Sequence, residues 1–167
     1  MSIRTCPSCG DGRLISRRGH HHFLESGLDN VHLLNVPIMT CAECGEEIIS
    51  IPEPTHLMKC IAEEGILLKP ASLSGSEIRF LRKNLMLKIG EFAQLLAVDR
   101  VTVSRWENGH DTPSKSSDRL IRLVYANQAM VSTDVIEKLS GHLKREEEDR
   151  QMDYVFPLTE HGFSCAA

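Results

Sequence analysis

Two short cysteine motifs constrain the fold of this chain more than any other feature of its sequence. Cys6-Pro-Ser-Cys9-Gly and Cys41-Ala-Glu-Cys44-Gly are both C-x-x-C-G motifs, and 31 residues separate them. Two residues between ligands let one tight turn present both sulfur atoms, and two such pairs complete a tetrahedral thiolate site. We therefore predict that Cys6, Cys9, Cys41 and Cys44 bind Zn²⁺, and that at least one β-hairpin lies between the pairs.

The sequence lacks the motifs that accompany a redox-active or a catalytic role of such cysteines. A thioredoxin-like redox pair lies beside a βαβ pattern, and a zinc deaminase carries an H-x-E motif upstream of P-C-x-x-C; the sequence has neither. Four protein ligands leave no position for water, so the zinc ion is expected to be structural. Cys60 and Cys165 are expected to be unpaired, as a core thiol and a tail residue, and the three histidines at 20–22 to lie on a solvated strand.

The pattern of the chain predicts three segments. Residues 1–68 are β-rich, with strands expected at 12–18, 20–26, 30–40 and 47–51 and a helix from about Pro54 to Gly65. Residues 69–75 have the composition of a linker. Residues 76–131 are helical, and residues 132–167 are expected to form a helical extension with an irregular acidic tail.

The helices of the second segment are well delimited. Ser74 followed by Glu77 is a capping-box signature, Asp99 is a good N-cap, and Asn108-Gly109 is a good C-terminal stop. These signals predict a helix after Ser74, a second at 89–96, a third from Asp99 to Asn108 and a fourth at 116–131. The residues expected to face inward on the second and fourth helices are Phe92, Leu95, Leu96, Leu120, Leu123 and Val124.

The second and third helices predict a DNA-reading element. Two short helices joined by a tight turn place the second helix in the major groove of double-stranded DNA. Packing of the pair is expected to use Leu96, Val98, Val103 and Trp106. The residues that then remain on the outer side are Arg100, Val101, Thr102 and Arg105.

The stretch from Glu91 to Gly109, which ends in Ser-Arg-Trp-Glu-Asn-Gly, resembles the lambda-repressor-like (Xre) helix-turn-helix family. The resemblance implies that Arg100, Val101 and Arg105 occupy base-contacting positions, and that Arg82 and Glu107 form a structural ion pair. Ile89 stands where the family usually has a polar residue, so Lys88 and backbone amides are expected to contact phosphate. The predicted DNA-binding residues are Lys88, Arg100, Val101, Thr102, Ser104, Arg105 and Asn108.

Charge is distributed unevenly along the chain. The net charge is −4, but residues 75–131 carry 9 basic and 6 acidic side chains, whereas residues 1–74 carry 6 and 9, and residues 132–167 carry 4 and 8. The only net-positive segment is therefore the predicted DNA-binding one. This agrees with a phosphate-facing surface there, and acidic flanks predict a steep dependence of DNA binding on salt.

A four-cysteine domain of this length joined to an Xre helix-turn-helix resembles the MqsA (YgiT-type) antitoxin family over residues 1 to about 131. The resemblance implies an α+β fold, in which a small β-rich zinc-binding domain precedes an all-α lambda-repressor-like domain and a helical C-terminal extension. It also implies a structural zinc ion, an N-terminal domain that neutralises a small mRNA-cleaving toxin, and a C-terminal domain that dimerises on a palindromic operator. Val101 stands where the family commonly has Asn, so the operator sequence that the family recognises cannot be assumed for this chain.

Two functional hypotheses remain open. The chain is an antitoxin that autorepresses its operon, or a free-standing Xre-family regulator whose zinc domain binds another partner. An enzyme is not expected, because the sequence has no nucleophile–base pair, carboxylate dyad, P-loop or dinucleotide fingerprint. The sequence also has no signal peptide and no apolar run of membrane-spanning length, so a cytoplasmic protein is expected. A homodimer is expected because one helix-turn-helix domain contacts only a half-site.

Overall fold

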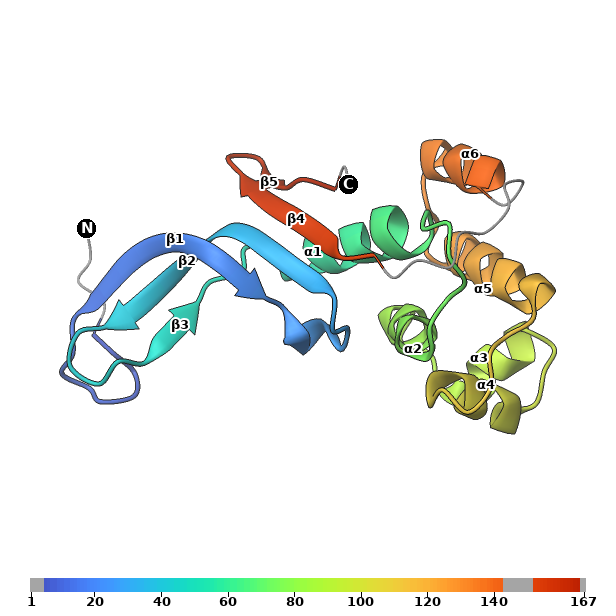
Figure 1. The fold of residues 1–167 in the computed structure, drawn as a ribbon, viewed down its shortest axis with the longest axis horizontal. Helices are drawn as coiled ribbons and strands as arrows, with labels where there is room; N and C mark the ends of the chain where they lie inside the picture. Colours follow the sequence, from blue (N-terminus) through green and yellow to red (C-terminus); the bar gives the residue numbers. More distant parts are fainter. Residues whose placement is uncertain (1–4, 143–151, 166–167) are drawn as a thin grey trace.

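The protein combines a β-sheet with a group of helices (Figure 1). A computed structural model describes residues 5–142 and 152–165. The sheet contains β1 (Leu14–His22), β2 (Val31–Cys41), β3 (Glu47–Ile49), β4 (Tyr154–Thr159) and β5 (Gly162–Phe163). The helices are α1 (Pro54–Cys60), α2 (Gly75–Asn84), α3 (Ile89–Leu95), α4 (Arg100–Glu107), α5 (Lys115–Gln128) and α6 (Thr133–His142). This arrangement confirms the α+β class.

The longest strand, β2, organises the sheet. It pairs antiparallel with β1 from Leu14 opposite Cys41 to His22 opposite His32, and a register shift lies between Gly19 and His21. The sequence predicted two strands, 12–18 and 20–26, where the structure has one. Because β2 is continuous along this edge, a bulge near Gly19 absorbs the irregularity and β1 does not break.

The C-terminal end of the chain returns to this sheet. β4 pairs parallel with β2, from Val31 opposite Tyr154 to Leu34 opposite Pro157, and β3 pairs with residues 38–40 of the same strand. Since β1 occupies one edge of β2, β3 and β4 share the other edge. The expected irregular tail is therefore wrong for residues 154–163: residues 154–157 pair with residues 31–34, and β5 pairs antiparallel with the end of β4.

The helices begin and end close to their sequence signals. Ser74 Oγ accepts a hydrogen bond from Glu77 N at 3.3 Å, and Ser74 N donates to Glu77 Oε2 at 2.7 Å, which completes the capping box. Asp99 and Asn108 flank α4. The helix that begins at Pro54 continues beyond Cys60 as a π-helix, Ile61–Ile66. Residues 143–151 of the expected helical extension lie outside the described residues.

Two helices bury faces that differ from those expected. Leu95 on α3 is 42% exposed, and Leu120 and Leu123 on α5 are 40% and 47% exposed, so the prediction that they face inward is wrong. The buried face of α5 contains an ion pair, Asp118 with Arg122, next to apolar residues. A pattern based on apolar residues alone cannot anticipate that charged side chains define the inner face.

This buried ion pair holds the segment between the sheet and the helix-turn-helix. Arg122 Nη1 donates to the carbonyl oxygens of Ile66, Leu67 and Lys69, at 3.0, 2.8 and 3.0 Å, and its Nη2 donates to that of Ala71 at 2.8 Å. Asp118, whose other oxygen accepts from Arg122 Nε, also accepts from the backbone N–H of residue 73 at 2.6 Å. The segment expected as a linker is thus fixed by buried hydrogen bonds.

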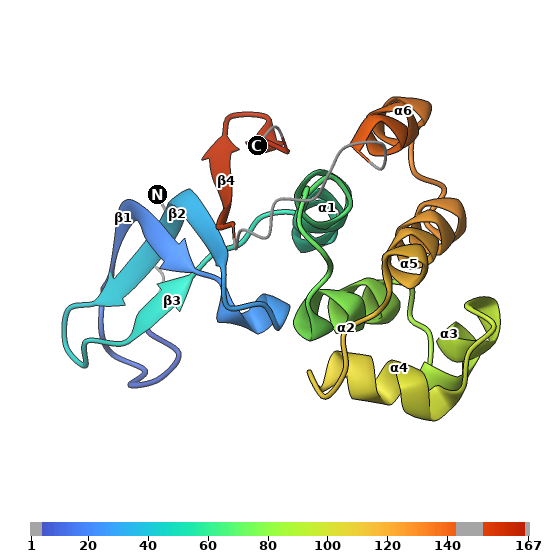
Figure 2. The ribbon, with the colours of Figure 1, turned by 45° about the vertical axis from the view of Figure 1, so that its right-hand side comes forward.

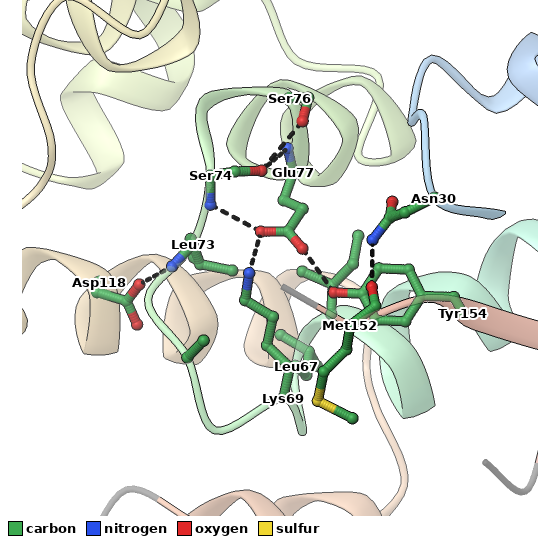
Figure 3. A network of polar contacts seen from close by, with 12 residues as sticks. Asn30, Leu67, Lys69, Leu73, Ser74, Ser76, Glu77, Asp118, Met152 and Tyr154 are labelled. Carbon is green, nitrogen blue, oxygen red and sulfur yellow. Dashed lines mark hydrogen bonds and ion pairs between the residues drawn. The ribbon is translucent and has the colours of Figure 1, made fainter. Parts of the chain in front are cut away.

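The carboxylate of Glu77 joins three parts of the chain (Figure 3). Its Oε2 accepts from Lys69 Nζ at 2.6 Å and from Ser74 N, and its Oε1 accepts from the hydroxyl of Tyr154 at 2.5 Å. Burial, followed by the nearby Glu77 charge, raises the pKa of Tyr154, so its hydroxyl stays protonated and donates. Beside it, Asn30 Nδ2 donates to the carbonyl oxygen of Met152 at 2.6 Å.

Replacing Glu77 tests the importance of this network. Glu77→Ala leaves a buried ammonium group and a buried hydroxyl without their acceptor, so we expect a loss of about 3–5 kcal/mol in the free energy of unfolding. Glu137→Ala, at an exposed position of α6, is the control and should change stability by less than about 0.5 kcal/mol. Denaturation by urea measures both; equal stabilities would contradict the role assigned to Glu77.

Candidate metal centre and nucleic-acid interface

The fold brings the four cysteines of the two motifs together at one end of the β1–β2 hairpin. Cys6 and Cys9 lie before β1, Cys41 ends β2, and Cys44 lies in the turn before β3. All four sulfur atoms lie within 4.8 Å of one another. Two of the separations are 3.7 Å, between Cys6 and Cys44, and 3.8 Å, between Cys9 and Cys41. A tetrahedron with Zn–S bonds of about 2.3 Å has edges of about 3.8 Å, so the four sulfur positions fit a zinc ion.

The glycines of this region have specific roles. Gly10 and Gly45, which follow the two pairs, have φ of 81° and 74°, a left-handed conformation that glycine adopts without strain. Gly12 lies against the sulfur cluster, and a Cβ atom there would collide with the sulfur of Cys41. Both turns therefore depend on residues without a side chain.

Backbone amides also favour the thiolate forms of Cys6 and Cys9, which a metal requires. The N–H of Gly12 donates to Cys9 Sγ at 3.3 Å. Hydrogen bonds from the backbone lower the pKa of Cys6 to about 7, mainly from the N–H of Cys9, and lower the pKa of Cys9, mainly from that of Asp11. Donors that stabilise a thiolate prepare it to bind a cation.

Removing one of the four thiol ligands should abolish metal binding at this centre. Cys9→Ser should lower the zinc content by one ion per chain, because three ligands hold the metal far less tightly than four. Removal of the metal by a chelator should unfold the zinc-binding domain, residues 1–68, and leave α2 to α5 helical. Circular dichroism and amide NMR spectra would follow both parts. Ser8→Ala, in the same turn, is the control; a Cys9→Ser chain with undiminished zinc would exclude this ligand set.

The helices α2, α3 and α4 form a helix-turn-helix unit around an apolar centre. Val103 and Trp106 of α4 and Phe92 of α3 are buried. Arg82 and Glu107 lie in bidentate contact, with Nε–Oε1 at 2.6 Å and Nη2–Oε2 at 2.9 Å, and the hydrogen bonds to Glu107 raise the pKa of Arg82. This buried pair ties α4 to α2 and fixes the orientation of α4.

The outer side of α4 lies at the edge of the helical part opposite α6 (Figure 2). Arg100, Val101 and Arg105 are exposed there, with Val101 at 67%. Thr102 and Ser104 are only half-buried. The three residues predicted to contact bases are therefore all accessible on α4.

The remaining predicted DNA-binding residues lie at the ends of the helices. Lys88 is exposed and forms the N-cap of α3. Asn108 ends α4, where its Nδ2 donates to the carbonyl oxygen of Ser104 at 2.7 Å and its Oδ1 accepts from Arg79 Nη2 at 2.7 Å. Asn108 thus already has intramolecular partners at the helix end.

The structure adds one residue that the sequence reasoning missed. Asp111 accepts hydrogen bonds from Arg105, with Nε–Oδ2 at 2.5 Å and Nη2–Oδ1 at 3.2 Å. The contact raises the pKa of Arg105 and lowers that of Asp111. Asp111 lies after the C-terminal stop of α4, in a loop that carries no motif. The spacing of six residues from Arg105 was the sole sequence signal for a contact between the two side chains.

Comparison with known proteins places this architecture in a family. The model of a family described as the antitoxin component of a bacterial toxin–antitoxin system, MqsA, matches residues 4–133. The chain belongs to the MqsA antitoxin family. The match includes both the four-cysteine centre and the helix-turn-helix of this MqsA-family protein.

The MqsA-family chain also has relatives that are named as transcriptional regulators. It is similar to the protein named "Uncharacterized HTH-type transcriptional regulator YiaG" of Escherichia coli strain K12, and to that of E. coli O157:H7. Identity is 40% over 65 residues in each case, which is 39% of this chain and 68% of the relative. The chain therefore shares its helix-turn-helix with HTH-type regulators. None of the helices in the described residues is long and apolar enough to cross a membrane.

Proposed function

We propose that this chain is a sequence-specific transcriptional repressor that binds double-stranded DNA and serves as the antitoxin of a type II toxin–antitoxin pair. The observation that carries the proposal is the exposed surface of α4, with Arg100, Val101 and Arg105, in a chain of the MqsA antitoxin family. In this proposal the protein has no enzymatic activity, and its task is to bind a DNA operator and a toxin in the cytoplasm.

The contact geometry of Arg105 supports a role in base recognition. A guanidinium group has five N–H donors, and Asp111 accepts from Nε and Nη2, which leaves Nη1 without a partner in this contact. Asp111 therefore orients the side chain and leaves its outer end available to guanine O6 and N7. Val101 beside it offers only apolar contact, for which the methyl group of thymine is the matching partner.

Replacing Arg105 tests this assignment. Arg105→Ala should reduce the preference for the operator over scrambled DNA by about 1–3 kcal/mol, or roughly 5- to 150-fold, because a bidentate contact to guanine is lost. Lys138→Ala, which removes the same charge from α6, should leave the preference unchanged. Fluorescence anisotropy with an operator selected from random duplexes measures both variants. An unchanged preference in the Arg105 variant would mean that α4 does not read the bases through this residue.

The four-cysteine centre has a structural role in this proposal. Zn²⁺ held by Cys6, Cys9, Cys41 and Cys44 would have four protein ligands and no open position, so it would stabilise the hairpin and would not activate water. The sheet half of the chain, residues 1–68 with the paired strand β4, would then present a rigid surface to the toxin, an mRNA-cleaving enzyme. Toxin binding and DNA binding would use opposite halves of the chain.

We also propose that the protein acts as a homodimer. One helix-turn-helix contacts only a half-site, and a two-fold dimer binds two half-sites of a palindromic operator about 34–36 Å apart or a multiple of that distance. Leu120 and Leu123, exposed on α5, provide apolar area in the helical half for contact between subunits.

Co-expression with the product of the neighbouring small reading frame separates the antitoxin from a free-standing regulator. We expect a stable complex to be retained on a tag carried by this chain, and the neighbour to arrest growth when expressed alone. Deletion of residues 1–68 should abolish toxin binding. The matched control is Arg105→Ala, which should lose operator preference and still retain the toxin. A harmless neighbour that is not retained would favour the free-standing regulator, a function that fits the similarity to an HTH-type transcriptional regulator.

A further inference from the structure

A second cluster of metal-binding side chains lies outside the two sites described above. His56 and Cys60 belong to α1, and Cys165 follows β5 near the end of the chain. Cys60 and Cys165 form a disulfide in the structure, with Cα atoms 5.0 Å apart. Both thiols were expected to be unpaired, and that prediction is wrong, because the return of the chain along β2 brings Cys165 to α1.

His56 completes this cluster. Its Nε2 lies 3.5 Å from Cys60 Sγ and 3.7 Å from Cys165 Sγ. His56 and Cys60 are four residues apart in a helix, so both side chains lie on one face. Directly after Cys60 the helix widens into a π-helix, a feature that is frequent at functional sites. The local backbone is therefore built to present these side chains together.

A buried carboxylate beside the cluster gives an independent indication of a cation. Glu63 is only 8% exposed, and within the described residues its Oε1 has no hydrogen-bond partner. Lys59 Nζ lies 3.7 Å from that oxygen. Glu63 lines a cavity of about 210 Å³ together with His56, Cys60 and Cys165. A buried oxygen without a donor is costly unless a further positive partner is supplied.

We propose that the reduced chain binds a second zinc-class divalent metal ion through His56 Nε2, Cys60 Sγ and Cys165 Sγ. Bond lengths of about 2.3 Å to sulfur and 2.0–2.1 Å to nitrogen give an N···S edge of about 3.6 Å in a tetrahedral site. In the disulfide form the two N···S distances are already 3.5 and 3.7 Å, so after reduction the two sulfur atoms only have to move apart from each other. The fourth position is left to a water molecule or to a carboxylate of the cavity, with Glu63 as the buried one.

Metal binding and the disulfide exclude each other. A disulfide holds its sulfur atoms about 2 Å apart, whereas two ligands of one tetrahedral zinc ion are about 3.8 Å apart. Reduction by two equivalents of a thiol reductant transfers two electrons and two protons to Cys60 and Cys165 and oxidises the reductant to its own disulfide. Each of the two thiols then loses its proton as the metal binds. Either state ties the C-terminal segment to α1.

The metal content of the reduced full-length chain tests the proposal. The protein is reduced with dithiothreitol, freed of it anaerobically, loaded with Zn²⁺, and analysed by inductively coupled plasma mass spectrometry. We expect two zinc ions per wild-type chain and one in His56→Ala and in Cys165→Ser. His56 is exposed, so its replacement leaves the fold intact and loss of metal reports on the site.

Controls separate this site from the four-cysteine centre. His161→Ala, at an exposed position between β4 and β5, should retain both ions, and Cys9→Ser should lose the other one. With Co²⁺ as the probe, His56→Ala should lose the absorption of a mixed nitrogen–sulfur site and keep that of a four-sulfur site. One zinc ion per reduced wild-type chain, or two in His56→Ala, would overturn the proposal and leave Cys60–Cys165 as a disulfide only.

Discussion

The buried carboxylate of Glu77 is the contact on which the arrangement of this molecule depends. A carboxylate that is only 3% exposed is stable only if its oxygens are fully hydrogen-bonded. Its partners come from the connecting segment, the first turn of α2 and the C-terminal strand β4. Satisfying one charge therefore requires that the C-terminal strand β4 meet the connecting segment and the first turn of α2, and this requirement sets the position of the sheet relative to the helix-turn-helix.

The ion pair of Asp118 and Arg122 extends this constraint. Its hydrogen bonds to the backbone between residues 66 and 73 leave the connection little freedom to bend. In the proposed function, the sheet half binds a toxin and α4 binds DNA, so a rigid connection holds the two binding surfaces in one fixed relation.

Local signals in the sequence predicted much of this structure. The capping box at Ser74 and the stop at Asn108 placed the helices correctly because such signals act within one helical turn. The spacing of the cysteines predicted a cluster, and the four sulfur atoms do converge. The strand β4 could not be predicted, since its partner lies at the other end of the chain and Pro157 weakens its strand pattern. The exposure of Leu120 and the burial of Arg122 could not be predicted either, because tertiary contacts and not periodicity determine which face of α5 is buried. The disulfide of Cys60 with Cys165 depends on the same return of the chain.

The most direct test of this account is amide hydrogen exchange in the full-length protein, followed by mass spectrometry, at residues 67–74 and 154–159. We expect the amides of residues 67, 73 and 74 and those of β4 paired with β2 to exchange as slowly as the buried face of α5, because these N–H groups donate to Ala62, Asp118, Glu77 and β2. Exchange of residues 67–74 at the rate of an unstructured peptide would show a flexible linker instead. It would contradict the claim that buried charges fix the two halves of the molecule together.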